Sequence, residues 1–258
     1  MENDEAKDWQ GSDLNCAVCA HRALAAASRC QLKHACVEDR YAKRIDRFFA
    51  WNPEQAQHFM SHPYFEVRAV AAKYLDIFHL AKLAQDTDET VRLTAALRLP
   101  QRILLTMRAD PDREVRIRVA ARLEESHLGS MIQDSDYYVR QIVARRIPAG
   151  MLVMMMHDAD SEVRLTVAQR IGEEWLAKMS GDEDRRVRLE AARRLNPLTL
   201  PVLLNDADWL VRYEVAGRIA EKYLQQMLND EEPAVRELAR KRLAGEDTAH
   251  DLPDLGAA

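Results

Sequence analysis

The dipeptide Val-Arg recurs eight times at a constant spacing of 24 residues, and this repeat constrains the fold more than any other feature of the chain. With the valine as position 0, position +1 is always Arg, position +8 is always Leu or Ile, and position +5 is Ala in seven repeats. A fixed period of this kind is the signature of a solenoid, in which each repeat buries its apolar face against its neighbours. The eight valines, which number repeats 1 to 8, are Val67, Val91, Val115, Val139, Val163, Val187, Val211 and Val235.

Each repeat is predicted to hold one amphipathic α-helix from about position −2 to +8 and one shorter helical segment. Apolar residues at positions 0, +4, +5 and +8 follow α-helical spacing, and the acid at −3 in seven repeats is a good N-cap. Leu at +13 and Leu or Met at +16 in the first seven repeats predict a short second helix, of α or 3₁₀ type. Two-helix repeats of about 33–47 residues are too long for this period, and no strand pattern of leucine-rich repeats is present. The predicted fold class is an all-α solenoid.

The pattern predicts three regions. Residues 1–61 form a four-cysteine domain followed by a capping unit, 62–245 form the array with its last repeat incomplete, and 246–258 form an acidic, disordered tail. No apolar run approaches the ~18 residues of a transmembrane helix, and the acidic N-terminus lacks the apolar core of a secretory signal, so we expect a cytoplasmic protein with no membrane partner. The apolar residues that keep the capping unit, 38–61, in phase are Phe48, Trp51 and Phe59.

Rows of arginine and acid accompany the repeat. Arg at +1 lies within the apolar arc of the helix, so it is expected to face inward and to need a charged partner. Rows +1 and +7 hold 15 arginines, and rows −5 and −3 hold 14 acids, which predicts an Arg–Asp ladder that fixes the register between repeats. The alternative is an exposed basic stripe that binds nucleic acid. It is disfavoured because the chain has a net charge of −5, with 29 basic and 29 acidic residues in 62–243.

Position −2 varies between repeats and is aromatic in every third one, at Phe65, Tyr137 and Trp209, with Tyr213 one turn after Trp209. Aromatic side chains on an otherwise polar row are candidates for a partner surface. The alternative is that these four side chains pack on neighbouring repeats.

All four cysteines lie within 21 residues, at Cys16, Cys19, Cys30 and Cys36, with the spacing C-x2-C-x10-C-x5-C. Clustered thiols in a cytoplasmic chain favour a metal site over disulfides, and four thiolates suit either zinc or an iron–sulfur cluster. The second pair is more widely spaced than the x2–x4 of most structural zinc sites, which favours the cluster. His21 and His34 adjoin these cysteines and are expected not to be ligands.

Segments such as Asp158-Ala-Asp-Ser-Glu-Val-Arg-Leu-Thr-Val-Ala-Gln-Arg-Ile171, together with the cysteine module, resemble the leucine-rich repeat variant family over nearly the whole chain. The resemblance implies a right-handed superhelix of alternating α and 3₁₀ helices, capped by an N-terminal 4Fe–4S domain. It assigns the cluster to the four cysteines and suggests a bacterial setting linked to nitrogen fixation. It implies no particular activity.

An enzyme is not expected, because the eight histidines are scattered and no HExxH or nucleophile motif is present. A cluster with four cysteine ligands also leaves no open coordination site for a substrate. We predict a protein-interaction scaffold that carries a 4Fe–4S cluster with a structural or redox-sensing role and binds an unidentified protein partner. The alternatives are a nucleic-acid-binding redox regulator and an electron carrier.

Overall fold

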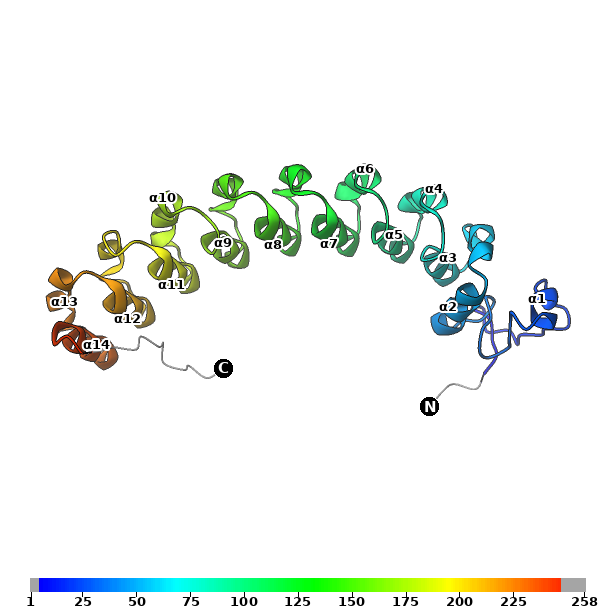
Figure 1. Ribbon diagram of the computed structural model, residues 1–258, viewed down its shortest axis with the longest axis horizontal. Coiled ribbons are helices and arrows are strands. Elements are labelled where there is room, and N and C mark those ends of the chain that lie inside the picture. Colours follow the sequence, from blue (N-terminus) through cyan, green and yellow to red (C-terminus); the bar gives the residue numbers. More distant parts are fainter. Residues whose placement is uncertain (1–4, 247–258) are drawn as a thin grey trace. The chain divides into compact units, whose positions relative to one another are not determined.

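The computed structural model describes residues 5–246, which form helices joined by short turns (Figure 1). The chain divides into two compact units, residues 1–130 and 131–258. Residues 5–246 contain no strand, only two isolated bridges, Lys7–Asp13 and Gln31–Ala35, so the all-α prediction is confirmed. The division predicted at residues 61 and 245 follows the repeat pattern and stays a prediction. Apart from Glu246, the predicted disordered tail lies outside the described residues.

The helices alternate between long α-helices and shorter segments, most of them 3₁₀ helices (η). Up to η4 the elements are α1 (Arg22–Ala26), α2 (Ala42–Trp51), η1 (Pro53–Phe59), α3 (Phe65–Ala71), α4 (Ile77–Leu80), η2 (Ala81–Gln85), α5 (Glu89–Ala96), α6 (Gln101–Leu104), η3 (Leu105–Ala109), α7 (Arg113–Arg122) and η4 (Glu125–Met131). The remaining elements are α8 (Tyr137–Arg146), η5 (Ala149–Met155), α9 (Ser161–Ala168), α10 (Glu173–Leu176), η6 (Ala177–Gly181), α11 (Arg185–Arg194), η7 (Leu200–Leu203), α12 (Trp209–Arg218), α13 (Glu221–Met227) and α14 (Pro233–Leu243).

The long helix of every repeat begins at position −2, as predicted. In six repeats the acid at −3 is the reason, because its carboxylate accepts a backbone N–H of the first turn and so satisfies a donor with no partner inside the helix. Most of these helices end before position +8. In repeat 3, Leu123 at +8 already has an extended backbone, with φ −57° and ψ 147°, while its side chain stays buried. This bend turns the chain toward the next segment.

The second segment is more varied than a plain 3₁₀ helix. In repeats 1, 2 and 5 a single α-helical turn (α4, α6 and α10) precedes the 3₁₀ helix. In repeat 7 the segment is the α-helix α13, which lies within the predicted choice of an α or 3₁₀ helix. The sequence Glu-Lys-Tyr-Leu-Gln-Gln-Met of α13 contains no Gly, Pro or Ser and consists mainly of strong helix formers.

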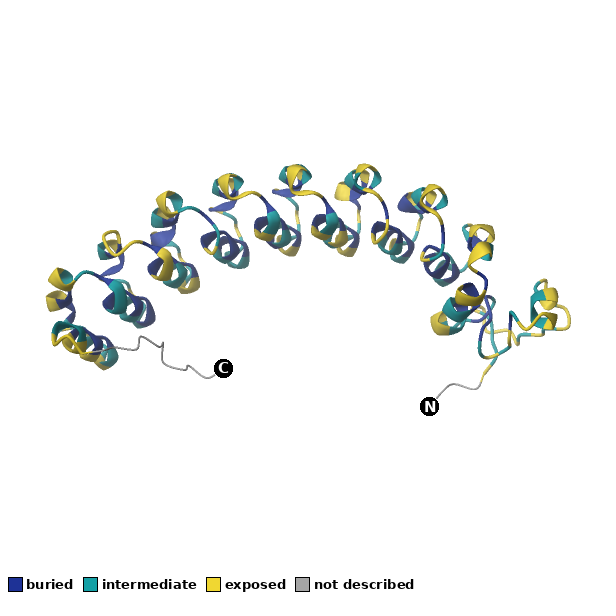
Figure 2. Cartoon of the chain, in the orientation of Figure 1, coloured by how far each residue is buried: buried dark blue, intermediate teal, exposed yellow. Residues whose placement is uncertain are grey.

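Within each unit the long helices lie side by side in one layer and the short segments form a second layer (Figure 1). The core lies between the two layers, where their facing sides are buried (Figure 2). In repeat 2, for example, Val91, Leu99 and Leu104 are completely buried at positions 0, +8 and +13. The apolar positions that recur from repeat to repeat are therefore the positions at which the two layers pack against each other.

The capping prediction can be checked at Asp112, which accepts the backbone N–H groups of Glu114 and Val115 at 2.9 and 3.1 Å. Asp112→Ala is expected to lower the free energy of unfolding by about 1 kcal/mol, because those two donors lose their acceptor. Glu232→Ala is the matched control, since Glu232 holds the same position but makes no side-chain cap bond. Urea denaturation of both variants measures the difference, and equal losses would contradict the capping role.

Candidate functional site

Two pairs of cysteines flank the short helix α1. Cys16 and Cys19 lie in the turns before it, and Cys30 and Cys36 follow it. The helix α1 occupies Arg22–Ala26 of the segment between the two pairs. Ser28, with φ +57°, follows the helix and turns the chain toward Cys30.

A tight hairpin accounts for the wide spacing of the second pair. Gln31 and Ala35 exchange backbone hydrogen bonds of 2.8 Å in both directions, with Lys33 in the left-handed region at φ +62°. Cys30 and Cys36 directly flank this bridge, and their thiols hydrogen-bond each other. The five intervening residues therefore form a loop that brings the two sulfurs together.

The four cysteines of this module are free thiols and form no disulfide. Burial raises the pKa of Cys16, and Cys36 and Cys19 raise it further, so these side chains lie within electrostatic reach of one another. The hydrogen bond between the thiols of the other pair lowers the pKa of Cys30 and raises that of Cys36, which burial raises further. The backbone N–H of His21 donates to Sγ of Cys19 at 3.4 Å, and Cys36 accepts a backbone N–H from Glu38. Such N–H···S bonds favour thiolates and tune cluster sulfurs.

This donor set fits a soft metal centre. It consists of four thiols, of which Cys30 and Cys36 are buried and Cys16 and Cys19 half-buried, all within one short module. Within residues 5–246, no three His, Cys, Asp or Glu side chains are grouped closely enough to hold a single metal ion. Four thiolates are the donors that zinc and iron–sulfur clusters prefer.

The histidines next to the thiols face protein groups. His21 Nε2 lies 3.4 Å from the Glu38 carboxylate, and His62 Nε2 lies 3.8 Å from it. Hydrogen bonds from His21 and then His62 lower the pKa of Glu38 to about 2, against the opposing effect of burial. The ring of His34 lies 5.5 Å from that of Trp51. These contacts join the cysteine module to the capping unit and to repeat 1.

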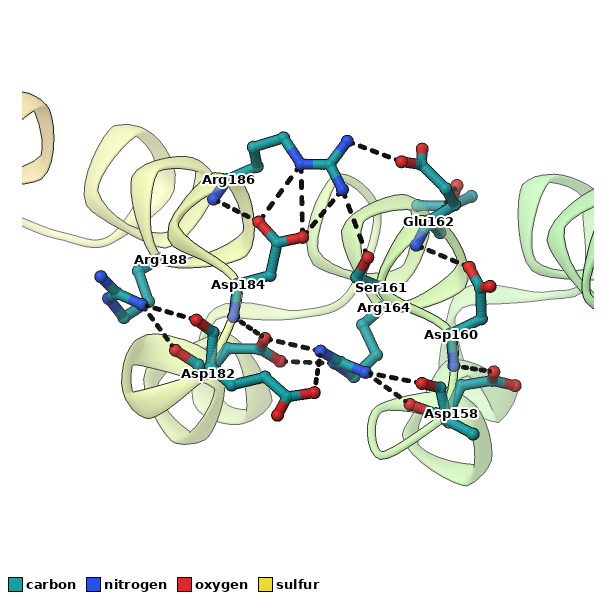
Figure 3. Close-up of polar contacts among 12 residues, drawn as sticks. Asp158, Asp160, Ser161, Glu162, Arg164, Asp182, Asp184, Arg186 and Arg188 are labelled. Atoms are coloured by element: carbon teal, nitrogen blue, oxygen red, sulfur yellow. Dashed lines mark hydrogen bonds and ion pairs between the residues drawn. The ribbon is translucent and has the colours of Figure 1, made fainter. Parts of the chain in front are cut away.

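The predicted ladder is present between Arg at +1 and Asp at −5 of the next repeat. In Figure 3, Arg164 donates from Nε and Nη2 to the Asp182 carboxylate at 2.8 and 3.0 Å, and from Nη1 to the Asp158 carbonyl at 2.8 Å. Only 7% of the Arg164 side chain and 8% of the Asp182 side chain are exposed. Because this row is buried and paired, it offers no basic stripe to nucleic acid. The same bidentate pair forms at Arg68–Asp86, Arg92–Asp110, Arg140–Asp158, Arg164–Asp182, Arg188–Asp206 and Arg212–Asp230.

Arginines at +7, which the matching totals of arginine and acid had counted toward the ladder, contact backbone carbonyls instead. Arg194, for example, donates to the carbonyls of Ala168 and Ile171, at the C-terminal end of α9 in the preceding repeat. Those carbonyls have no partner within their own helix, and the guanidinium supplies one. The acids at −3 cap their own helices instead, so the matching totals of Arg and acid were coincidental. Arginines with such contacts are Arg98, Arg122, Arg170, Arg194, Arg218 and Arg242.

The four aromatic candidates for a partner surface all lie in the first two turns of long helices. Phe65 begins α3, is half-buried and packs edge-on against Tyr64, with ring centroids 5.3 Å apart. Tyr137 begins α8 and is 44% exposed. Trp209 begins α12 and meets Tyr213 edge-on at 6.5 Å, both rings being half-buried. Their role in binding a partner stays a prediction.

Two further residues of the site were not anticipated. Arg29 donates to the carbonyl of Trp51, and Asn52 Nδ2 donates to the carbonyls of Arg29 and Phe48, both at 2.8 Å. The sequence feature that could have pointed to them is Tyr74, which stands in repeat 1 where the other repeats have Arg at +7.

No helix within residues 5–246 is both long and apolar enough to span a bilayer.

A helical repeat array joined to a four-thiol module defines the class of protein, and comparison with known proteins agrees. A family model described as "LRV protein FeS4 cluster" matches residues 6–58, and one described as "Leucine rich repeat variant" matches 137–160. A solved structure described as "a leucine-rich repeat variant with a novel repetitive protein structural motif" is 40% identical, with a TM-score of 0.81 over 89% of this chain and 99% of that one. The chain belongs to the leucine-rich repeat variant family.

A relative from Rhodobacter capsulatus is described as an uncharacterized 27.7 kDa protein in the nifB 3′ region. It is 46% identical over 99 residues, which are 38% of this chain. The match spans 40% of that relative's length.

Proposed function

We propose that this protein is a non-enzymatic protein-interaction scaffold whose N-terminal module binds a 4Fe–4S cluster through Cys16, Cys19, Cys30 and Cys36. The observation that carries the proposal is the gathering of four free thiols in one module at the end of a helical repeat array. The family model for an FeS4 cluster over residues 6–58 supports the same cofactor. The alternative cofactor is zinc, which would make the module a structural cap.

A bound cluster would supply one-electron redox chemistry and, with it, sensitivity to oxidants. The protein contributes the four thiolates and the N–H groups of His21 and Glu38 that point at two of the sulfurs. The proposed role of the cluster is structural or redox-sensing.

The scaffold role is supported by the pairing of charged side chains within the array. A hollow of about 380 Å³ is lined by Asp206, Arg212 and Asp230, whose charged groups are already paired. The Asp206 carboxylate accepts from Arg188, and Arg212 donates to the Asp230 carboxylate and to the Asp206 carbonyl. This leaves a surface for contact rather than a set of free catalytic groups. The exposed aromatic Tyr137 and the half-buried Trp209 and Tyr213 are the proposed partner contacts. The partner is a protein of unknown identity, and a cytoplasmic location stays a prediction.

A link to nitrogen fixation is part of the proposal. It is supported by the printed description of the Rhodobacter capsulatus relative, which places that protein in the nifB 3′ region. Redox sensing fits such a setting, because iron–sulfur centres respond to oxidation.

The experiment is anaerobic purification of the full chain with iron, sulfide and zinc counts, followed by its use as bait in loaded and metal-free form. We expect about four iron and four sulfide per chain, and loss of both in the variant Cys30→Ser with Cys36→Ser. We further expect partners to bind the two forms with different affinity. Stoichiometric zinc with no colour would refute the cluster, and equal capture by both forms would refute sensing while leaving the scaffold.

A further inference from the structure

The joint between the capping unit and repeat 1 lacks both of the arginine contacts that hold the later repeats. Arg at +7 normally reaches carbonyls 26 and 23 residues back, as Arg194 reaches Ala168 and Ile171. In repeat 1 this position is Tyr74, whose hydroxyl instead bonds the Asp46 carbonyl at 3.2 Å. The carbonyls left for other partners are those of Phe48 and Trp51, at the end of α2.

The ladder between Arg and Asp is also interrupted at this joint. Arg44 stands 18 residues before His62, and 18 residues is the separation at which six arginines of the ladder meet an aspartate. Arg44 pairs instead with the fully buried Asp39 at 2.9 Å, inside its own unit. His62 lies 3.8 Å from Glu38, which is a looser contact than the bidentate pairs of the array.

Arg29 of the cysteine module supplies one of the missing contacts, and Asn52 of the capping unit supplies the other. Arg29 donates to the Trp51 carbonyl and pairs with Glu54. Asn52 Nδ2 donates to the carbonyls of Phe48 and Arg29. Together they satisfy the two backbone acceptors that an arginine at position 74 would reach.

The module also covers the aromatic core of the capping unit. The His21 ring packs against the rings of Phe48 and Phe59, with centroids 6.0 and 5.4 Å apart. The same histidine contacts Glu38, and Glu38 also contacts His62 of repeat 1. Removing the module would therefore uncover this aromatic face.

The contacts that the module itself makes come from residues beside proposed cluster ligands. Arg29 precedes Cys30, His21 stands two residues after Cys19, and Glu38 stands two residues after Cys36. Building on the cluster assigned above, we propose that the ordered structure of α2 and η1 depends on the cluster. They stay ordered while the module is folded around its cluster and loosen when the cluster is lost. The later repeats carry their own arginines and stay unchanged, so the redox signal is a local opening of residues 42–59.

The coupling follows from the way small metal modules fold. The free energy of metal binding is largely folding free energy in a module with little core of its own. Within α1 and its flanking turns, the buried apolar side chains are few. Loss of the cluster would release Arg29 and His21 from their positions and leave the Trp51 carbonyl, at the end of α2, without its donor.

Hydrogen exchange of the full chain, read by mass spectrometry in loaded and metal-free forms, tests this. We expect exchange in 42–59 to rise by roughly tenfold or more on removal of iron, with less than about a twofold change in 161–218. No difference in 42–59, or an equal rise through every repeat, would overturn the proposal.

Two variants test the coupling between the cysteine module and residues 42–59 separately from the identity of the cofactor. Tyr74→Arg restores the arginine of the later repeats and is expected to make exchange in 42–59 nearly equal in the two forms. Arg29→Ala is expected to speed exchange in α2 of the loaded protein. The matched control Arg194→Ala should do so only in α9, and equally in both forms. If the chain holds no iron, the cofactor assignment fails, whereas a silent Arg29→Ala with iron still bound would refute the coupling alone.

Discussion

Replacement of Arg164 by alanine is expected to lower the free energy of unfolding by about 3 to 5 kcal/mol, because it strands a buried charge. Asp182 would lose both hydrogen bonds of its bidentate pair while its side chain stays only 8% exposed. The carbonyls of Asp158 and Ala159 would lose their donor in the same step. The cost is therefore that of breaking a buried pair by removing one partner, and it exceeds the value of a surface ion pair several-fold.

Urea denaturation followed by far-UV circular dichroism measures this loss, and hydrogen exchange locates it between repeats 5 and 6. The control is Arg186→Ala, because Arg186 also bridges repeats, to Glu162 at 2.6 Å, but is 47% exposed. That change is expected to cost less than about 1 kcal/mol. A loss below about 0.5 kcal/mol in Arg164→Ala would mean that the row is solvated, and the nucleic-acid alternative would regain support.

Phe48→Ala is expected to cost about 3 to 5 kcal/mol, through loss of apolar contact and the cavity left behind. Phe48 is completely buried, and its ring meets those of Phe49 and Phe59 edge-on at 5.4 and 6.0 Å. Phe78→Ala is the matched control, since the Phe78 side chain is 87% exposed and should change stability little. Thermal unfolding of the two variants measures the contrast, and comparable losses would show that the capping unit lacks a packed aromatic core.

The period, the helix starts and the ladder were all predictable because each follows from local spacing. An acid at −3 marks a helix start wherever it occurs, and a buried Arg at +1 must find a carboxylate whatever the details of the fold. Burial of Val91, Leu99 and Leu104 follows in the same way from their helical phase. These features recur in at least six of the eight repeats, so several copies of the sequence support each inference.

The contacts of Arg at +7 were not predictable from charge counting. Their partners are carbonyl groups, which every residue carries, so nothing in the sequence marks Ala168 or Ile171 as acceptors. The link from Arg29 to Trp51 escaped for a related reason, because it joins segments 22 residues apart outside the repeat. The spacing of the four cysteines predicts a shared site, and this stays a prediction. The hairpin between Cys30 and Cys36 was not predictable, because it depends on Lys33 adopting a positive φ.

The ladder also governs how such a chain can change in length. In each of the six pairs given above, one repeat supplies the aspartate and the repeat before it supplies the arginine, 18 residues earlier in the chain. Duplication or loss of a 24-residue segment keeps both the arginine and the aspartate of each such pair. An insertion of another length leaves an arginine and an aspartate unpaired in the core. At the end of the array, Arg236 bonds the carbonyls of Asp230 and Glu231, and no carboxylate among residues 5–246 pairs with it. Tandem duplication in register is thus the growth step that this architecture accepts without a buried unpaired charge.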